Sequence, residues 1–172
     1  MARHRSDEND ATVTLEPVAF DRHAALLADW FRRPHVARWW GDTEDRIDQM
    51  CKTPRDEHAV ISVGGCPVGY IRWQAVDRAA LDAAGLSEIP DGAIDIDILL
   101  GEPSWLGRGV GSTALRLLLE RLRNQKKGPL AGLCTSIENA VAIQCFEKAG
   151  FRKLRQYDDP TYRRCWVFVA DL

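Results

Sequence analysis

Three glycines within five residues stand between an apolar segment and a long helical pattern. Gly107, Gly109 and Gly111 follow the strand-like residues 93–100 and open a helical segment that runs to about residue 124. Glycine lets the main chain approach a ligand closely, and the free amides and dipole of a helix N-terminus attract an anion. The loop therefore predicts a site for a phosphate or a pyrophosphate, unless it is a glycine-rich turn with no catalytic role.

The spacing of this glycine loop excludes two nucleotide-binding motifs. No Lys-Ser or Lys-Thr pair follows the last glycine, so the loop is not a Walker A motif. The sequence GRGVG also lacks the GxGxxG spacing of a dinucleotide-binding fingerprint. The identity of the anion must therefore be sought in another part of the chain.

A second motif lies downstream, from Asn139 to Phe151, with the sequence NAVAIQCFEKAGF. Together with LGRGVG at 106–111, it resembles the two cofactor motifs of the GNAT superfamily of acetyl-coenzyme A-dependent N-acetyltransferases. Within that superfamily the chain looks most like the aminoglycoside 6'-N-acetyltransferases, followed by their siderophore-acylating relatives. The resemblance covers essentially residues 11–172 and includes RWWG at 38–41, GY at 69–70 and IDILL at 96–100.

The resemblance implies that acetyl-coenzyme A is the acetyl donor, with no metal. Its pyrophosphate is expected on the glycine loop, its pantetheine arm along the end of strand 93–100, and its thiol near Asn139 and Phe146. The residues expected to contact it are Ile98, Leu99, Leu100, Leu106, Gly107, Arg108, Gly109, Val110, Gly111, Ser112, Thr113, Asn139, Ala142 and Phe146.

Two carboxylates precede the glycine loop on one face of strand 93–100. Side chains alternate across a strand, so Asp95 and Asp97 share a face and the isoleucines between them share the other. Transfer to an amine requires a neutral nucleophile, and Asp97, which matches the family's strand carboxylate, is the candidate general base. We expect Asp95 to contact a cationic substrate and the backbone near Leu99 to stabilise the oxyanion. The alternative for Asp97 is a surface carboxylate at a strand end.

Aromatic side chains are the candidates for an acceptor wall, because sugar rings and cations both favour aromatic faces. The candidates are Trp39, Trp40, Tyr70 and Trp73, each of which could instead belong to the core. An acidic stretch, with seven acids against one base from Asp77 to Glu102, would draw a polycationic acceptor.

Two positions depart from the family's pattern. Position 146 is Phe where the family often has a Tyr that protonates the leaving thiolate, so water or direct thiolate release must suffice. Position 134 is Cys where many relatives have an acid, so one expected anchor for a polyamine is missing.

The favoured function is acetyl transfer from acetyl-coenzyme A to an aminoglycoside amine, the 6'-amine, by direct attack on the thioester. An N-acyltransferase of a siderophore precursor or another small amine is the alternative. Such relatives carry a His near the end of the carboxylate strand, and residues 93–100 contain none. A coenzyme A-binding module without turnover, suggested by Phe146, is the second alternative.

The order of predicted elements is mixed α+β, with one central sheet and helices on both faces. The resemblance adds that the sheet is mostly antiparallel and splayed at the cofactor strand. We expect strands at 11–15, 58–63, 67–74, 93–100, 130–134, 153–157 and 163–169, and helices at 20–33, from a cap at 42 or 43 to 51, 109–124 and 139–149. Residues 35–42 are expected to be an aromatic linker and residues 77–91 an acidic loop.

Composition predicts one globular domain, residues 11–172, after a flexible tail at residues 1–10. The chain of 172 residues is 45% apolar and 28% charged, and it shows neither a signal peptide nor an apolar run that could span a membrane. Five scattered cysteines indicate reduced core thiols and a cytoplasmic protein. The pI near 6.1 gives no support for nucleic acid or membrane partners. We expect a small, polycationic amine as partner and a monomer or homodimer.

Overall fold

The computed structural model describes residues 12–159 and 163–172, so the predicted tail at residues 1–10 lies outside the described residues. The described chain forms a seven-stranded sheet in the order β1-β2-β3-β4-β5-β7-β6. Its strands are β1 Val13–Pro17, β2 His58–Val63, β3 Cys66–Val76, β4 Ala93–Leu100, β5 Leu130–Ser136, β6 Arg152–Asp159 and β7 Arg163–Asp171. Neighbouring strands are antiparallel except β4 and β5, which confirms the mostly antiparallel sheet.

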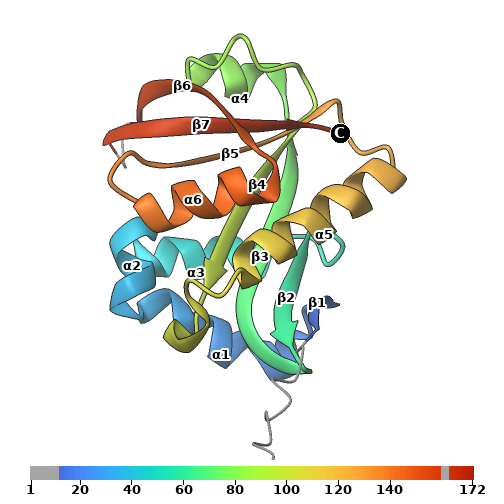
Figure 1. The fold of residues 1–172 in the computed structure, drawn as a ribbon, viewed down its shortest axis with the longest axis vertical. Helices are drawn as coiled ribbons and strands as arrows, with labels where there is room; N and C mark the ends of the chain where they lie inside the picture. Colours follow the sequence, from blue (N-terminus) through green and yellow to red (C-terminus); the bar gives the residue numbers. More distant parts are fainter. Residues whose placement is uncertain (1–11, 160–162) are drawn as a thin grey trace, which may run out of the picture.

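Helices cover both faces of this sheet, as the sequence predicted (Figure 1). They are α1 Phe20–Arg32, α2 Pro34–Trp40, α3 Thr43–Lys52, α4 Arg78–Ala83, α5 Val110–Asn124 and α6 Ala140–Ala149. One core cluster joins α5 and α6 to the face of β3 and β4 that carries Ile71 and Ile96. A second cluster joins α1 to α3 to the opposite face, through Val60 and Tyr70. The mixed α+β class is therefore confirmed.

Local capping explains where α3 and α6 begin. The Asp42 carboxylate accepts hydrogen bonds from the backbone N–H groups of Glu44 and Asp45, at 3.0 and 3.1 Å, and so satisfies amides that lack a partner within the helix. The predicted cap at 42 or 43 is thus Asp42. Gly150, in a left-handed conformation, ends α6 at the residue predicted from the sequence.

Two segments differ from the sequence predictions. The expected linker at 35–42 is mostly helix α2, because Pro34 ends α1 but also occupies the first turn of the next helix, where its missing N–H costs nothing. The expected loop at 77–91 contains α4, which Asp77 caps by accepting a hydrogen bond from the Ala80 N–H at 2.8 Å.

The prediction of buried cysteines is wrong for three of the five. Cys51 on α3, Cys66 at the β2–β3 hairpin and Cys134 on β5 are exposed, Cys145 is half-buried and Cys165 is buried. An apolar character alone does not place a thiol in the core, because hairpins and helix surfaces tolerate small side chains equally well. No helix in the described ranges has both the length and the apolar character needed to cross a membrane.

Candidate functional site

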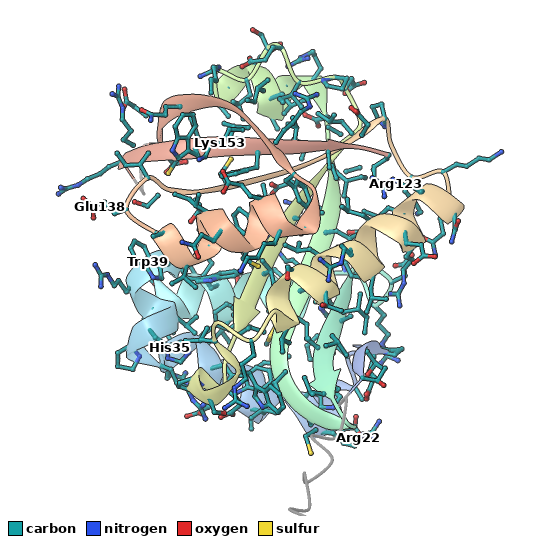
Figure 2. The ribbon with its side chains drawn as sticks, in the orientation of Figure 1. Arg22, His35, Trp39, Arg123, Glu138 and Lys153 are labelled. Carbon is teal, nitrogen blue, oxygen red and sulfur yellow. The ribbon has the colours of Figure 1, made fainter. Side chains whose placement is uncertain are left out.

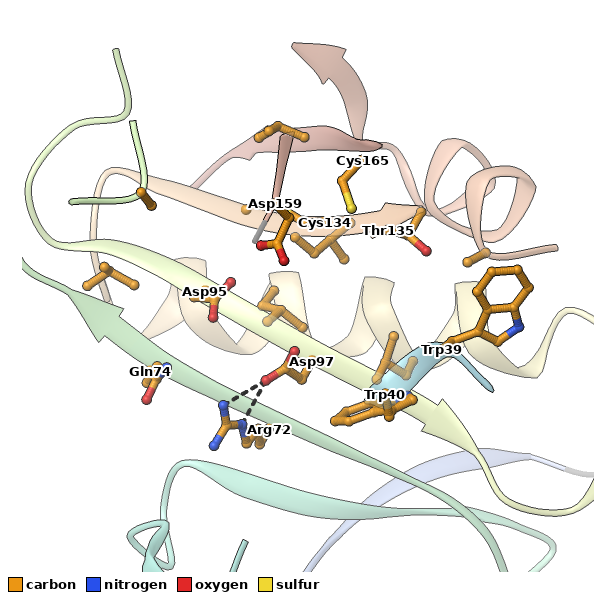
Figure 3. Close-up of a pocket in the computed structure, with 18 of the residues that line it drawn as sticks. Trp39, Trp40, Arg72, Gln74, Asp95, Asp97, Cys134, Thr135, Asp159 and Cys165 are labelled. Carbon is orange, nitrogen blue, oxygen red and sulfur yellow. Dashed lines mark hydrogen bonds and ion pairs between the residues drawn. The ribbon is translucent and has the colours of Figure 1, made fainter. Parts of the chain in front are cut away.

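The sheet parts between β4 and β5. Their parallel pairing is registered at Ile94 with Ala131 and at Asp95 with Gly132, while β4 continues to Leu100. A pocket of about 1200 Å³ opens beside this point, lined by β3 to β7, by residues of α2, α3 and α4 and by the start of α6. We call it the acceptor pocket, after the ligand that the sequence predicts for its carboxylates and aromatic residues (Figure 3).

Strand alternation directs both predicted carboxylates into the acceptor pocket. Asp95 and Asp97 line it from β4, and Gln74 and Arg72 line it from the opposite positions of β3. Arg72 donates from both Nε and Nη2 to the Oδ2 atom of Asp97, each at 2.8 Å (Figure 3). The pair is a charge-assisted contact in a largely shielded place, because the Arg72 side chain is only 14% exposed.

The two carboxylates differ in their surroundings. Burial, together with the neighbouring charge of Asp97, raises the pKa of Asp95 from 3.8 to about 7, although Arg72 opposes the rise. The pocket floor therefore combines a carboxylate bound to a guanidinium with one that holds its proton up to neutral pH.

Another carboxylate of the lining, Asp159, lies across the acceptor pocket on β6 (Figure 3). Tyr157 donates a hydrogen bond from its hydroxyl to the Oδ2 atom of Asp159 at 3.0 Å. Cys134 on β5 lies between the two acidic walls. Its thiol faces the open pocket, but desolvation by the surrounding protein, together with the charges of Asp95 and Asp159, raises its pKa to about 12. Sequence analysis missed Asp159 because the predicted strand ended at residue 157. Continuing the two-residue alternation from Tyr157 would have found it.

Helix α2 supplies the aromatic wall. Trp39 and Trp40 occupy its last turn and line the acceptor pocket, as predicted (Figures 2 and 3). Trp40 packs edge-on against Phe31 of α1, with ring centroids 5.3 Å apart, and its carbonyl accepts a hydrogen bond from Arg46 of α3. The guanidinium of Arg38 lies 4.6 Å from the centre of the Trp39 ring.

The other two predicted aromatic wall residues belong to the core. Tyr70 is completely buried among α1 to α3, and its hydroxyl lies 3.1 Å from Nδ1 of His58. Trp73 borders the pocket but is 5% exposed, and its ring packs on the α5 face, where Arg121 covers it at 5.8 Å. Tyr70 and Trp73 lie on opposite faces of β3, so at most one of them could have faced the acceptor.

The acidic stretch does not form one surface. Asp77 caps α4, Asp82 pairs with Arg78 at 2.9 Å, and Glu88 pairs with Arg155 of β6. Glu102 accepts hydrogen bonds from the Trp30 indole and from Arg33, each at 2.9 Å. Most carboxylates of the stretch therefore have a role in the fold, and only Asp95 and Asp97 among them line the acceptor pocket, so the attraction of a polycation by the whole stretch stays a prediction.

The glycine loop lies at the start of α5. Gly109 immediately precedes the helix with φ 79°, and the Ser112 hydroxyl donates to its carbonyl at 2.9 Å. Gly111 packs tightly beside α6, since a Cβ there would lie 2.9 Å from the sulfur of Cys145. Residues 106–109 are exposed, whereas Val110, Gly111 and Ser112 are buried and Thr113 is half-buried. The exposed loop thus leads directly into the first helical turn, whose amides lack partners within the helix.

The remaining predicted donor contacts border the acceptor pocket or the end of β4. Asn139, Ala142 and Phe146 line the pocket from α6. The Asn139 side chain also caps α6 by accepting a hydrogen bond from the Ala142 N–H at 3.2 Å. Phe146 is 5% exposed and packs edge-on against Phe168. Ile98 and Leu100 are half-buried beside the α5 cluster, whereas the side chain of Leu99 is buried among α1 to α3.

The first helices hold the end of β4 through contacts that sequence analysis missed. His35 lies at the start of α2 (Figure 2), and its Nε2 atom is 3.0 Å from the carbonyl oxygen of Leu100. Arg33 donates to the carbonyl of Gly101 at 2.9 Å. These contacts fix the backbone where the strand leaves the sheet. No group of His, Cys, Asp and Glu side chains within residues 12–159 and 163–172 is arranged to hold a metal ion.

Comparison with known families identifies the class of protein that this fold and site define. The model of the acetyltransferase (GNAT) domain matches residues 19–159, and the chain belongs to this family. The sequence is 31% identical over 162 residues to aminoglycoside N(6')-acetyltransferase type 1 of Klebsiella pneumoniae, covering 86% of this chain and 77% of that protein. The relative of the same name from Serratia marcescens matches equally well.

Solved structures agree with this assignment. A structure of aminoglycoside acetyltransferase AAC(6')-Ib with coenzyme A has a TM-score of 0.77 and 27% identity, covering 93% of this chain and 95% of that one. A structure of the same enzyme with coenzyme A and kanamycin gives the same values.

Proposed function

We propose that this chain transfers an acetyl group from acetyl-coenzyme A to an amine of an aminoglycoside, with the 6'-amine as the acceptor. The observation that carries the proposal is the pair of carboxylates in a pocket at the parted strands of a GNAT fold. The relative at 31% identity, which the chain matches over most of its length, acts on the 6'-amine according to its name.

The glycine loop and the end of β4 are suited to hold the donor. The exposed loop at 106–109 and the first turn of α5 offer backbone amides to the pyrophosphate. When bound, acetyl-coenzyme A supplies the thioester that the amine attacks. Ile98 to Leu100, together with Asn139, Ala142 and Phe146, border the opening in which the acyl arm would lie.

In the acceptor pocket, the protein must deliver a neutral amine to this opening. Asp97 takes the proton of the acceptor ammonium through its Oδ1 atom or through water, since Arg72 binds its Oδ2 atom. Asp95 contacts a positive group of the same substrate, and Trp39 and Trp40 wall the sugar ring. The backbone near Leu99 stabilises the oxyanion, and because Phe146 has no acidic proton, water protonates the leaving thiolate.

Thiol release from acetyl-coenzyme A tests the proposal. Purified protein is assayed with aminoglycosides, polyamines and hydroxylated lysine or ornithine, after the signal of its own exposed Cys51, Cys66 and Cys134 has been subtracted. We expect release with aminoglycosides and a product acetylated at the 6'-amine by mass spectrometry and NMR. Release only with a hydroxylated amino acid would favour a siderophore-type enzyme, and the absence of release with every acceptor would favour a binding module.

Asp97→Asn tests the proposed base. Turnover should fall by about 10² or more, as is typical when a general base is lost. Asp82→Asn is the matched control, because this aspartate pairs with Arg78 on α4 and does not line the acceptor pocket. Unchanged turnover in Asp97→Asn would remove Asp97 from this role.

A further inference from the structure

A cation in the floor of the acceptor pocket is unexpected in a site for a cationic substrate. Arg72 is registered directly across from Asp97, and both of its contacts go to the same carboxylate oxygen (Figure 3). Its side chain is 14% exposed and that of Asp97 is 31% exposed, so solvent screens the pair only partly. A guanidinium here repels the ammonium ion of a substrate unless the carboxylates that it contacts neutralise its charge.

The titratable groups around Asp97 come from five elements. Tyr70 lies beneath it on β3, Asp95 precedes it on β4, Arg46 reaches toward the floor from α3, and Cys134 and Asp159 lie beyond Asp95 on β5 and β6. Arg46 is engaged by the Trp40 carbonyl at 2.9 Å and by Gln49 at 3.0 Å, and it acts on Asp95 less strongly than Arg72 does. Arg72 is therefore the cation bound directly to the carboxylate pair.

We propose that Arg72 is a positioning residue for the acetyl transfer: it offsets the repulsion between Asp95 and Asp97 and leaves one oxygen of Asp97 turned to the acceptor amine. This inference rests on the proposed function. Two carboxylates on one strand face repel each other, and the pair relieves the repulsion by retaining a proton until the pH is high. A protonated carboxyl cannot accept the proton of the ammonium, so a pair without Arg72 would work only at alkaline pH.

The pH profile of Arg72→Met separates this role from a purely structural one. We expect the acid limb of the kcat/KM profile to move to higher pH by about 1 unit. This is the smallest pKa change that is typical of losing a neighbouring opposite charge. Activity should then be about tenfold lower than wild type on the acid side and should approach wild type near pH 9. Arg72→Lys keeps the charge and should shift the limb less.

Asp95→Asn in the Arg72→Met background gives the most specific test, because it removes the repulsion between Asp95 and Asp97 that Arg72 offsets. The acid limb of the double variant should return toward the wild-type position. Arg32→Met is the charge-matched control, since Arg32 loses only an exposed pair with Glu44. A loss of activity in Arg72→Met that is equal at every pH, or a double variant that fails to restore the limb, would overturn the proposal.

A titration of the carboxyl carbons by NMR reads the same effect without turnover. Resonances assigned to the pair by the Asp95→Asn and Asp97→Asn variants should finish titrating at higher pH in Arg72→Met than in wild type. If Arg72→Met does not unfold cooperatively, Arg72→Gln takes its place, and failure of both to fold would assign Arg72 to the fold and refute the inference. An unshifted titration contradicts this inference alone, whereas a wild-type protein that releases no thiol with any aminoglycoside contradicts the proposed function.

Discussion

Replacing Asp95 by Asn should stabilise the protein at neutral and alkaline pH, although it alters the acceptor pocket. Burial and the charge of Asp97 raise the pKa of Asp95 from 3.8 to about 7 in the folded protein. Between these two pH values the folded chain binds a proton that the unfolded chain has lost, so the free energy of unfolding falls as pH rises through this window.

The size of the effect follows from the two pKa values. A difference of about 3 pH units, at about 1.4 kcal/mol for each, corresponds to about 4 kcal/mol for a fully shielded charge above pH 7. Solvent reaches the half-buried side chain through the pocket and screens part of this. Asn has a similar shape and no charge, so we expect Asp95→Asn to gain about 1–3 kcal/mol at pH 8 and almost nothing below pH 4.

Urea unfolding followed by tryptophan fluorescence, between pH 4.5 and pH 9, measures this gain. The difference between Asp95→Asn and wild type should grow through the window from pH 4 to pH 7 and then level off. Asp82→Asn, which removes an exposed carboxylate on α4, should run parallel to wild type. A constant difference between Asp95→Asn and wild type, or a variant less stable than wild type at pH 8, would refute the reasoning, because the charged Asp95 would then be stabilised by its neighbours.

Three further variants test other parts of the site. Asp159→Asn should raise KM about tenfold for acceptors with several amines, which is the loss expected for one charge-assisted hydrogen bond. Asp158→Asn is the control, because Asp158 lies outside the pocket lining, and it should leave KM unchanged. An equal rise of KM for a monoamine would contradict this prediction. Gly109→Ala should lower the free energy of unfolding by about 1–2 kcal/mol, because φ is 79° at this position, and calorimetry should show weaker binding of acetyl-coenzyme A. Gly85→Ala is the control, because Gly85 has φ 69° but lies far from the loop, and it should lower stability alone. Phe146→Ala should lower the free energy of unfolding by about 3–5 kcal/mol, since its ring is 5% exposed, while Val141→Ala, at 62% exposed, should change it little.

The elements that sequence predicted well have signals within a few residues. The glycine loop before α5, the Asp42 cap and the Gly150 stop depend on backbone conformation and on hydrogen bonds to nearby amides, so residue type reports them directly. Helices α2 and α4 were missed because each spans two turns or fewer, too short for an apolar period to be visible.

The site was predicted in part for the same reason. Alternation along β4 correctly placed Asp95 and Asp97 on one face, since that depends on the strand alone. The same rule could not say which face of β3 becomes pocket, and Tyr70 and Trp73 were assigned to an acceptor wall although each packs in a core cluster. Which face stays open depends on where α1 to α3 and α5 settle against the sheet.

The sequence by itself determined the family, the mixed α+β class, the glycine-rich turn before α5 and the two carboxylates, because each is encoded by neighbouring residues or by a motif. Only the tertiary structure decided that Arg72 meets Asp97 across a strand pair and that Asp159 lies opposite both. Those contacts join residues far apart in the chain, and their register is set by the packing of the whole sheet rather than by any local preference.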